Sequence, residues 1–147
     1  MTLKERFQSD VKDAMKEKDK LRKDAIQMLR AAVLQIEKDK QITLDDDGVV
    51  EVLAQELKSR REALSEIEKG GREDLAQGLR QEIALIQSYM PEPLSEAELE
   101  AIVREAVAKT GAQSAKDMGR VMKEAMPMVK GRADGGQINA IVKRLLG

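Results

Sequence analysis

Apolar residues recur every three or four positions through seven segments of this chain, a spacing that lines them along one side of an α-helix. Strict alternation of apolar and polar residues, which is typical of half-buried strands, is scarcely present. The apolar side chains are leucine, isoleucine, valine, alanine and eight methionines, and Phe7 and Tyr89 are the only aromatic residues. Because these are mostly good helix formers, we expect an all-α fold.

Four of the helical patterns lie before Pro93. The first follows Thr2, which forms a capping box with Glu5, and ends near residues 18–20. The second spans residues 21–40, and the third starts where Thr43 and Asp46 repeat the capping pattern. The fourth runs from the Gly70-Gly71 break to Pro91, because proline disfavours helix in the residue before it. The residues expected to face inward include Leu3, Phe7, Val11, Ala14, Met15, Leu21, Ala25, Met28, Leu29, Val33, Val49, Leu53, Leu57, Leu64, Ile67, Leu75, Leu79, Ile83 and Ile86.

Three more helical patterns follow, and each has a start signal of its own. In each signal, an N-cap residue stands three positions before a residue whose side chain can reach back to it. The pairs are Ser95 with Glu98, Ser114 with Asp117 and Asp134 with Gln137. Short one-sided helices can bury their apolar stripes only against one another. We therefore expect two helical bundles, a four-helix unit over residues 1–93 and a three-helix unit over residues 94–147.

The chain contains neither cysteine nor histidine. By itself it cannot build a disulfide, a zinc site of cysteine or histidine ligands, a cysteine nucleophile or a histidine-based triad. The N-terminal segment MTLKERFQSD lacks the apolar region of a secretory signal, and apolar runs reach only about four residues, too short to span a bilayer. We expect a cytoplasmic protein without a metal, a cofactor or a membrane partner.

The net charge of −1 conceals a basic C-terminal end. Residues 1–93 carry 17 lysines and arginines against 20 acidic residues, whereas the stretch from Lys109 onward carries eight against three. Helical spacing places several of these cations opposite the apolar stripe, and Gly131 gives the turn between the last two helices access to positive φ. The residues expected to contact a phosphate backbone are Lys116, Arg120, Lys123, Lys130, Gly131, Arg132, Lys143 and Arg144.

One alternative to this phosphate-binding interpretation remains open. Charged runs on short helices are usually solvated faces, and Asp134, as an N-cap, would occupy the N–H groups that a phosphate needs. The C-terminal unit also contains no aromatic residue on which a base could stack. If RNA binds there, we expect recognition of its shape and backbone.

A second group of cations lies in the N-terminal half, where Arg60 and Arg61 interrupt the apolar stripe between Leu57 and Leu64. One interpretation lays the stem of one arginine over the core and pairs its guanidinium with a carboxylate of a neighbouring helix. The other is a secondary basic patch that faces RNA or a partner, made of Arg22, Arg30, Lys58, Arg60 and Arg61.

Several motifs together give the chain a resemblance to a known family. They are Asp19-Lys20-Leu21-Arg22, Leu29-Arg30, Glu56-Leu57-Lys58, Arg60-Arg61, Tyr89-Met90-Pro91, Leu94-Ser95-Glu96, Gly119, Val121-Met122-Lys123, Lys130-Gly131-Arg132-Ala133-Asp134, Ile138-Asn139 and Val142. The whole chain resembles YqeY proteins, and its end resembles the tail of the B subunit of glutamine-dependent tRNA amidotransferases. The resemblance implies four helices followed by three, and helical and tail regions that engage tRNA. It also implies that amidation belongs to a larger catalytic part and a separate amidase, both absent from this chain.

These observations lead to one preferred hypothesis and two alternatives. The preferred one is a non-catalytic helical module that binds tRNA or associates with a tRNA-dependent amidotransferase or synthetase complex. The first alternative is a component of a carbon–nitrogen ligase with glutamine as amido-N-donor, active only in a complex. The second is a protein-interaction adaptor without an RNA role. We assign no catalytic residue, since no pair of acidic or basic residues has a distinctive spacing.

Overall fold

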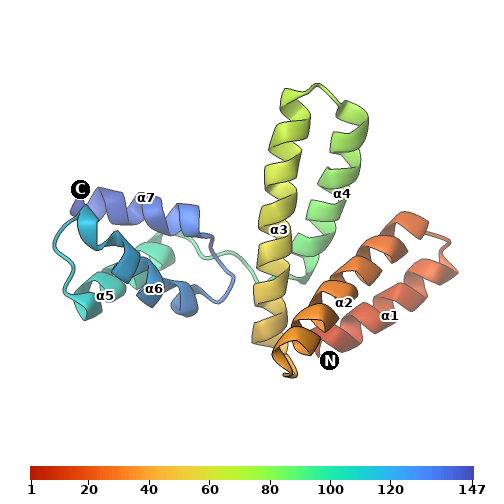
Figure 1. The fold of residues 1–147 in the computed structure, drawn as a ribbon, viewed down its shortest axis with the longest axis horizontal. Helices are drawn as coiled ribbons and strands as arrows, with labels where there is room; N and C mark the ends of the chain where they lie inside the picture. The colour runs from red at the N-terminus through yellow and green to blue at the C-terminus, as the bar shows by residue number, and fades with distance from the viewer. The chain divides into compact units, whose positions relative to one another are not determined.

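The computed structural model describes residues 1–147 and contains seven α-helices, one short 3-10 turn and no strand, which confirms the all-α class (Figure 1). The chain separates into two compact units, Met1–Met90 and Pro91–Gly147. We call them the N-terminal unit and the C-terminal unit. The sequence predicted the division after Pro93, three residues beyond the observed one. Hydrogen bonds attach the intervening segment to the C-terminal unit, as described below.

The N-terminal unit consists of two helical hairpins. Helix α1 (Leu3–Lys16) pairs with α2 (Lys20–Lys40), and α3 (Asp46–Lys69) pairs with α4 (Glu73–Tyr89) (Figure 1). One apolar cluster joins the hairpins, because all four helices contribute side chains to it. The buried members are Leu3, Phe7, Val11, Ile26, Leu29, Val33, Val49, Val50, Leu53, Leu57, Ile86 and Tyr89.

The two aromatic residues fasten α1 to the end of α4. The rings of Phe7 and Tyr89 meet edge to face with their centroids 4.8 Å apart, and the Tyr89 hydroxyl donates a hydrogen bond to Asp10. The Arg6 guanidinium lies 4.9 Å from the centre of the Tyr89 ring. Burial and the neighbouring Asp10 carboxylate raise the pKa of Tyr89 well above its ordinary value.

The C-terminal unit packs α5 (Glu96–Thr110), α6 (Met118–Val129) and α7 (Gly135–Leu146) around a second apolar cluster. A 3-10 turn, η1 (Ala115–Asp117), leads into α6, and α7 contacts both α6 and this turn. Pro127 lies inside the last turns of α6. The buried residues are Leu99, Val103, Ala106, Val121, Ala125, Val129, Ile138, Ile141 and Val142.

Three of the expected helix starts are confirmed. The side chains of Thr2 and Ser95 each accept a hydrogen bond from the backbone N–H three residues on, at 3.1 Å. Asp134 and Gln137 exchange both bonds of a capping box, at 2.8 and 3.0 Å.

The expected starts of α3 and α6 differ from the structure. Asp45, not Thr43, caps α3 by accepting from the Gly48 N–H at 2.9 Å. Asp46 is therefore the first residue of the helix, not the third after the N-cap, and its carboxylate accepts the Leu3 N–H at 3.0 Å. The expected capping box of Ser114 and Asp117 is present, but it opens the 3-10 turn Ala115–Asp117, and α6 begins only at Met118.

Four residues expected to face inward are exposed instead. Met15, Leu21, Met28 and Leu75 each expose about half or more of their surface. They lie at the margins of the helical stripes, where periodicity alone does not decide which side a neighbouring helix covers. The width of the buried face is set by tertiary packing.

Candidate nucleic-acid interface

The seven charged residues expected to contact phosphate all lie in the C-terminal unit, and we call them the tail cations. Lys116 lies in η1, Arg120 and Lys123 in α6, and Lys143 and Arg144 in α7, while Lys130 and Arg132 belong to the turn between α6 and α7. All are exposed except Arg132, which is partly buried. Their side chains fall into two groups according to what they contact.

Arg120 is bound to the end of α5. Its guanidinium donates to the Thr110 carbonyl at 3.1 Å and pairs with Asp117 at 2.8 Å. The Asp117 carboxylate also accepts the Gln113 and Ser114 N–H groups. The Gln113 N–H and then Arg120 hold the pKa of Asp117 below its ordinary value. Arg120 thus links the end of α5 to the turn that precedes α6.

Arg132 is bound to the segment before α5. Its Nε donates to the Glu92 carbonyl at 2.8 Å, and its guanidinium lies 3.6 Å from the Glu98 carboxylate. The Arg132 carbonyl accepts the Leu94 N–H at 2.9 Å. These contacts explain why residues 91–93 belong to the C-terminal unit. Gly131, just before, has φ 76°, a left-handed conformation that favours glycine.

Arg144 is bound to the first half of α5 itself. Its guanidinium pairs at 3.4 Å with Glu100 of α5, which Arg104 also contacts at 2.9 Å. Hydrogen bonds from Arg104 and then Arg144 lower the pKa of the Glu100 carboxyl. All three arginines among the tail cations therefore contact α5 or its flanking segments.

The lysines among the tail cations differ from the arginines in their contacts. Lys116, Lys123 and Lys143 are exposed, and their ammonium groups make no hydrogen bond or ion pair within the chain. Lys130 forms the C-cap of α6, in the left-handed conformation. At the start of α7, the Asp134 carboxylate accepts the Gln137 N–H, so the chain itself supplies an acceptor at this helix end.

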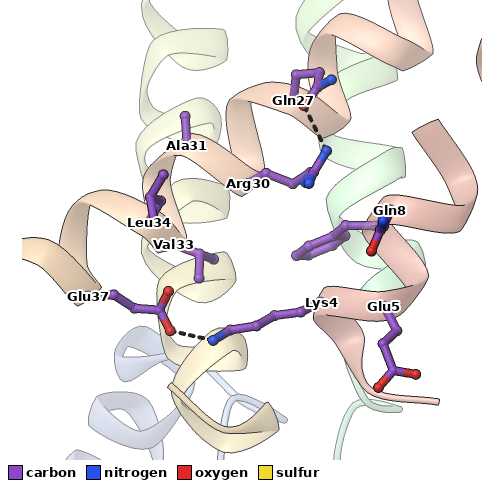
Figure 2. Close-up of a pocket in the computed structure, with 10 residues that line it drawn as sticks. Lys4, Glu5, Gln8, Gln27, Arg30, Ala31, Val33, Leu34 and Glu37 are labelled. Atoms are coloured by element: carbon purple, nitrogen blue, oxygen red, sulfur yellow. Dashed lines mark hydrogen bonds and ion pairs between the residues drawn. The ribbon is translucent and has the colours of Figure 1, made fainter. Parts of the chain in front are cut away.

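The five members of the secondary basic patch turn toward different neighbours. Arg22 pairs with Glu17 at 3.4 Å and approaches Asp10 to 4.0 Å. The Arg60 side chain, only 11% exposed, pairs with Glu56 on its own helix and with Glu82 of α4 at 3.5 Å. This is the alternative in which one arginine stem lies over the core and its guanidinium pairs with a neighbouring helix. Arg30 lies in a groove between α1 and α2 (Figure 2). Lys58 and Arg61 are exposed on α3 and have no partner within the chain.

That groove was not expected from the sequence, which gives no signal for it. At one end Lys4 forms an ion pair with Glu37, and at the other Arg30 donates to Gln27 at 3.2 Å (Figure 2). Glu37 also accepts the Leu44 N–H at 2.8 Å. Lys4 and then this N–H lower the pKa of the Glu37 carboxyl. The groove is thus crossed by an ion pair that connects α1, α2 and the segment before α3.

Replacing Glu37 with glutamine should lower the free energy of unfolding at pH 7, and this loss should shrink as the pH falls. A depressed acid pKa means that the stabilisation is fully present above the unfolded-state pKa, about 4.3. It disappears as the pH falls through the lower folded-state pKa. Urea unfolding of both proteins at pH 7, 5 and 3 measures the difference. A difference that does not change with pH would contradict the assignment.

No group of three or more histidine, cysteine, aspartate or glutamate residues is placed to hold a metal ion. Among the helices, none combines the length and apolar character that crossing a membrane requires.

Comparisons with known proteins agree with the resemblance noted in the sequence. A family model described as Yqey-like protein matches residues 4–146. Two similar curated proteins are both called altered inheritance of mitochondria protein 41, mitochondrial. The one from Pyrenophora tritici-repentis is 26% identical, over 97% of this chain and 80% of its own length. The one from Candida glabrata is 34% identical, over 63% of this chain and 52% of its own length. Their names place these relatives in mitochondria, and the cytoplasm stays a prediction for this chain.

Proposed function

Because this chain belongs to the Yqey-like protein family, we propose that it is a helical tRNA-binding module, non-catalytic in isolation, that works alone or within a tRNA-dependent amidotransferase or synthetase complex. The observation that carries the proposal is the exposure of Lys116, Lys123 and Lys143, which have no partner within the chain, in a stretch with eight basic and three acidic residues. The tail cations are the candidate contacts. Lysines without an internal partner are available to neutralise phosphates.

The expected mode of binding is to the backbone of a folded RNA. Phe7 and Tyr89, the only aromatic residues, are buried in the N-terminal unit, so the C-terminal unit has no ring on which a base could stack. Phosphate contacts fix position without reading sequence. We expect similar affinity for tRNAs of different sequence, and a strong dependence on salt.

Measuring the affinity of the full chain for bulk tRNA at rising salt concentration tests this function. Each neutralised phosphate contributes about 0.9 to the slope of log affinity against log salt. For three contacts, the affinity should fall about 40-fold between 50 and 200 mM salt. Absence of binding at 50 mM salt, or binding with no slope, would reject the proposal. Recovery of a protein partner from nuclease-treated extract, together with no RNA affinity, would favour the adaptor hypothesis.

We also propose that the two units are bundles that fold independently, divided at Pro91. A fragment of residues 91–147 should be more stable than one of residues 94–147 by about 1 kcal/mol, because only the longer fragment keeps the Glu92 carbonyl that accepts from Arg132. Urea unfolding followed by far-ultraviolet circular dichroism compares the two. Equal stabilities would remove the role given to residues 91–93, and an unfolded longer fragment would reject independent folding.

A further inference from the structure

We propose that six of the seven tail cations divide by residue type: Lys116, Lys123 and Lys143 contact the phosphates, whereas Arg120, Arg132 and Arg144 form contacts within the chain that hold α6 and α7 to α5, and we call these three arginines the clamps. This inference rests on the proposed tRNA-binding function for its lysine half only. The clamp half concerns the fold of the C-terminal unit and stands independently of any ligand.

The clamp half follows from what each guanidinium already contacts. Arg120 binds the Thr110 carbonyl at one end of α5, and Arg132 binds the Glu92 carbonyl before its other end. Arg144 pairs with Glu100 within α5. Each donor used in this way would have to be released before it could bind a phosphate.

The lysine half follows from exposure and spacing. Lys116 and Lys123 are seven residues apart along η1 and α6, which at the helical rise of 1.5 Å per residue is roughly 10 Å. Duplex DNA presents about one phosphate per 3.4 Å of helix axis on each strand, so a nucleic-acid backbone that runs along α6 has several phosphates within a span of this order. Lys143 lies on α7, which packs against both η1 and α6. All three ammonium groups are without an internal partner.

The difference in chemistry sets the kind of ligand. An arginine binds phosphate through two parallel hydrogen bonds, whereas a lysine ammonium is a mobile point charge that tolerates many geometries. A surface that contacts RNA through lysines alone attracts the phosphates of an RNA whatever its base sequence. The folded shape of the RNA, which determines how many phosphates lie within reach at once, then becomes the source of preference.

Two triple variants with equal charge change test the division. One carries Lys116→Gln, Lys123→Gln and Lys143→Gln, and the other carries Arg120→Gln, Arg132→Gln and Arg144→Gln; each removes three positive charges from the same unit. The lysine variant should lose about 2.7 from the salt slope for bulk tRNA and keep its Tm. The arginine variant should keep the slope, and its C-terminal unit should melt about 6–12 °C lower, from about 2–4 °C for each of the three arginines.

Further variants keep the test decisive if the arginine variant fails to fold. Arg120→Lys, Arg132→Lys and Arg144→Lys preserve the charge but not the clamp geometry, so they should lower Tm and leave the slope intact. Replacing three exposed lysines of the N-terminal unit, Lys12, Lys38 and Lys40, by glutamine should change neither quantity.

The outcomes separate this inference from the proposed function. A slope lost in the arginine variants, or retained in the lysine variant, overturns the division while tRNA binding stands. Failure of the native chain to bind tRNA at 50 mM salt rejects the proposed function and the lysine half with it, and the melting data then decide the clamp half alone. A single-stranded oligonucleotide of equal charge that binds as tightly as tRNA would show that any accessible phosphate chain suffices, and would overturn the preference for a folded shape.

Discussion

Replacing Phe7 with alanine is expected to lower the free energy of unfolding of the N-terminal unit by about 3–5 kcal/mol. Phe7 is 1% exposed at the centre of the cluster that joins both hairpins, so its removal leaves a cavity that neighbouring helices cannot fill without moving. It also removes the edge-to-face contact with Tyr89, which is worth about 0.5–1.5 kcal/mol beyond burial. For a unit of this size, the Tm should fall by at least about 12 °C.

Met15→Ala is the matched control, since it removes a large apolar side chain from the same helix. Met15 is 61% exposed, so we expect a change within about 0.5 kcal/mol. Amide hydrogen exchange measures whether the loss of stability lies in α1–α4. Equal losses in the two variants would show that Phe7 is not the centre of this core.

Replacing Ile138 with alanine should unfold most of the C-terminal unit at 25 °C. Ile138 is completely buried among helices α5, α6 and α7, and the substitution costs about 2–5 kcal/mol. A domain of fewer than 60 residues has a stability of the same order, because it buries a smaller share of its surface. Protection from hydrogen exchange should vanish in α5–α7, and affinity for tRNA should fall with it.

Met126→Ala provides the comparison within the same unit, because Met126 is 42% exposed on α6. We expect this variant to retain both hydrogen-exchange protection and RNA affinity. Persistence of RNA binding in the unfolded Ile138→Ala protein would mean that charge alone is sufficient, and would refute a folded interface.

The sequence predicted best what is encoded locally. Thr2, Ser95 and Asp134 announce helix starts because an N-cap and its partner lie only three residues apart. The prediction for Thr43 was wrong because Asp45 caps the helix two residues later, and Asp46, the expected partner of Thr43, instead accepts the Leu3 N–H of another helix. Met28 and Leu75 failed likewise, because helical periodicity defines an apolar stripe but not how much of it a neighbour covers.

The candidate site shows the same limit. Helical spacing identified the tail cations, but lysine and arginine look equivalent in a charge count. Only the fold brings Glu92 and Glu100 to Arg132 and Arg144, across separations of about 40 residues. Between Arg60 and Arg61 the sequence likewise could not choose, and packing against α4 selected Arg60 for the pair with Glu82.

The placement of Tyr89 makes the two units optically distinguishable. The chain has no tryptophan and a single tyrosine, and that tyrosine is buried in the N-terminal unit. Intrinsic fluorescence and near-ultraviolet circular dichroism therefore follow that unit almost exclusively, while the C-terminal unit is spectroscopically silent. A tryptophan introduced at exposed Met126 would report on the silent unit as the chain's only indole, so loosening of either unit could be followed in the intact protein.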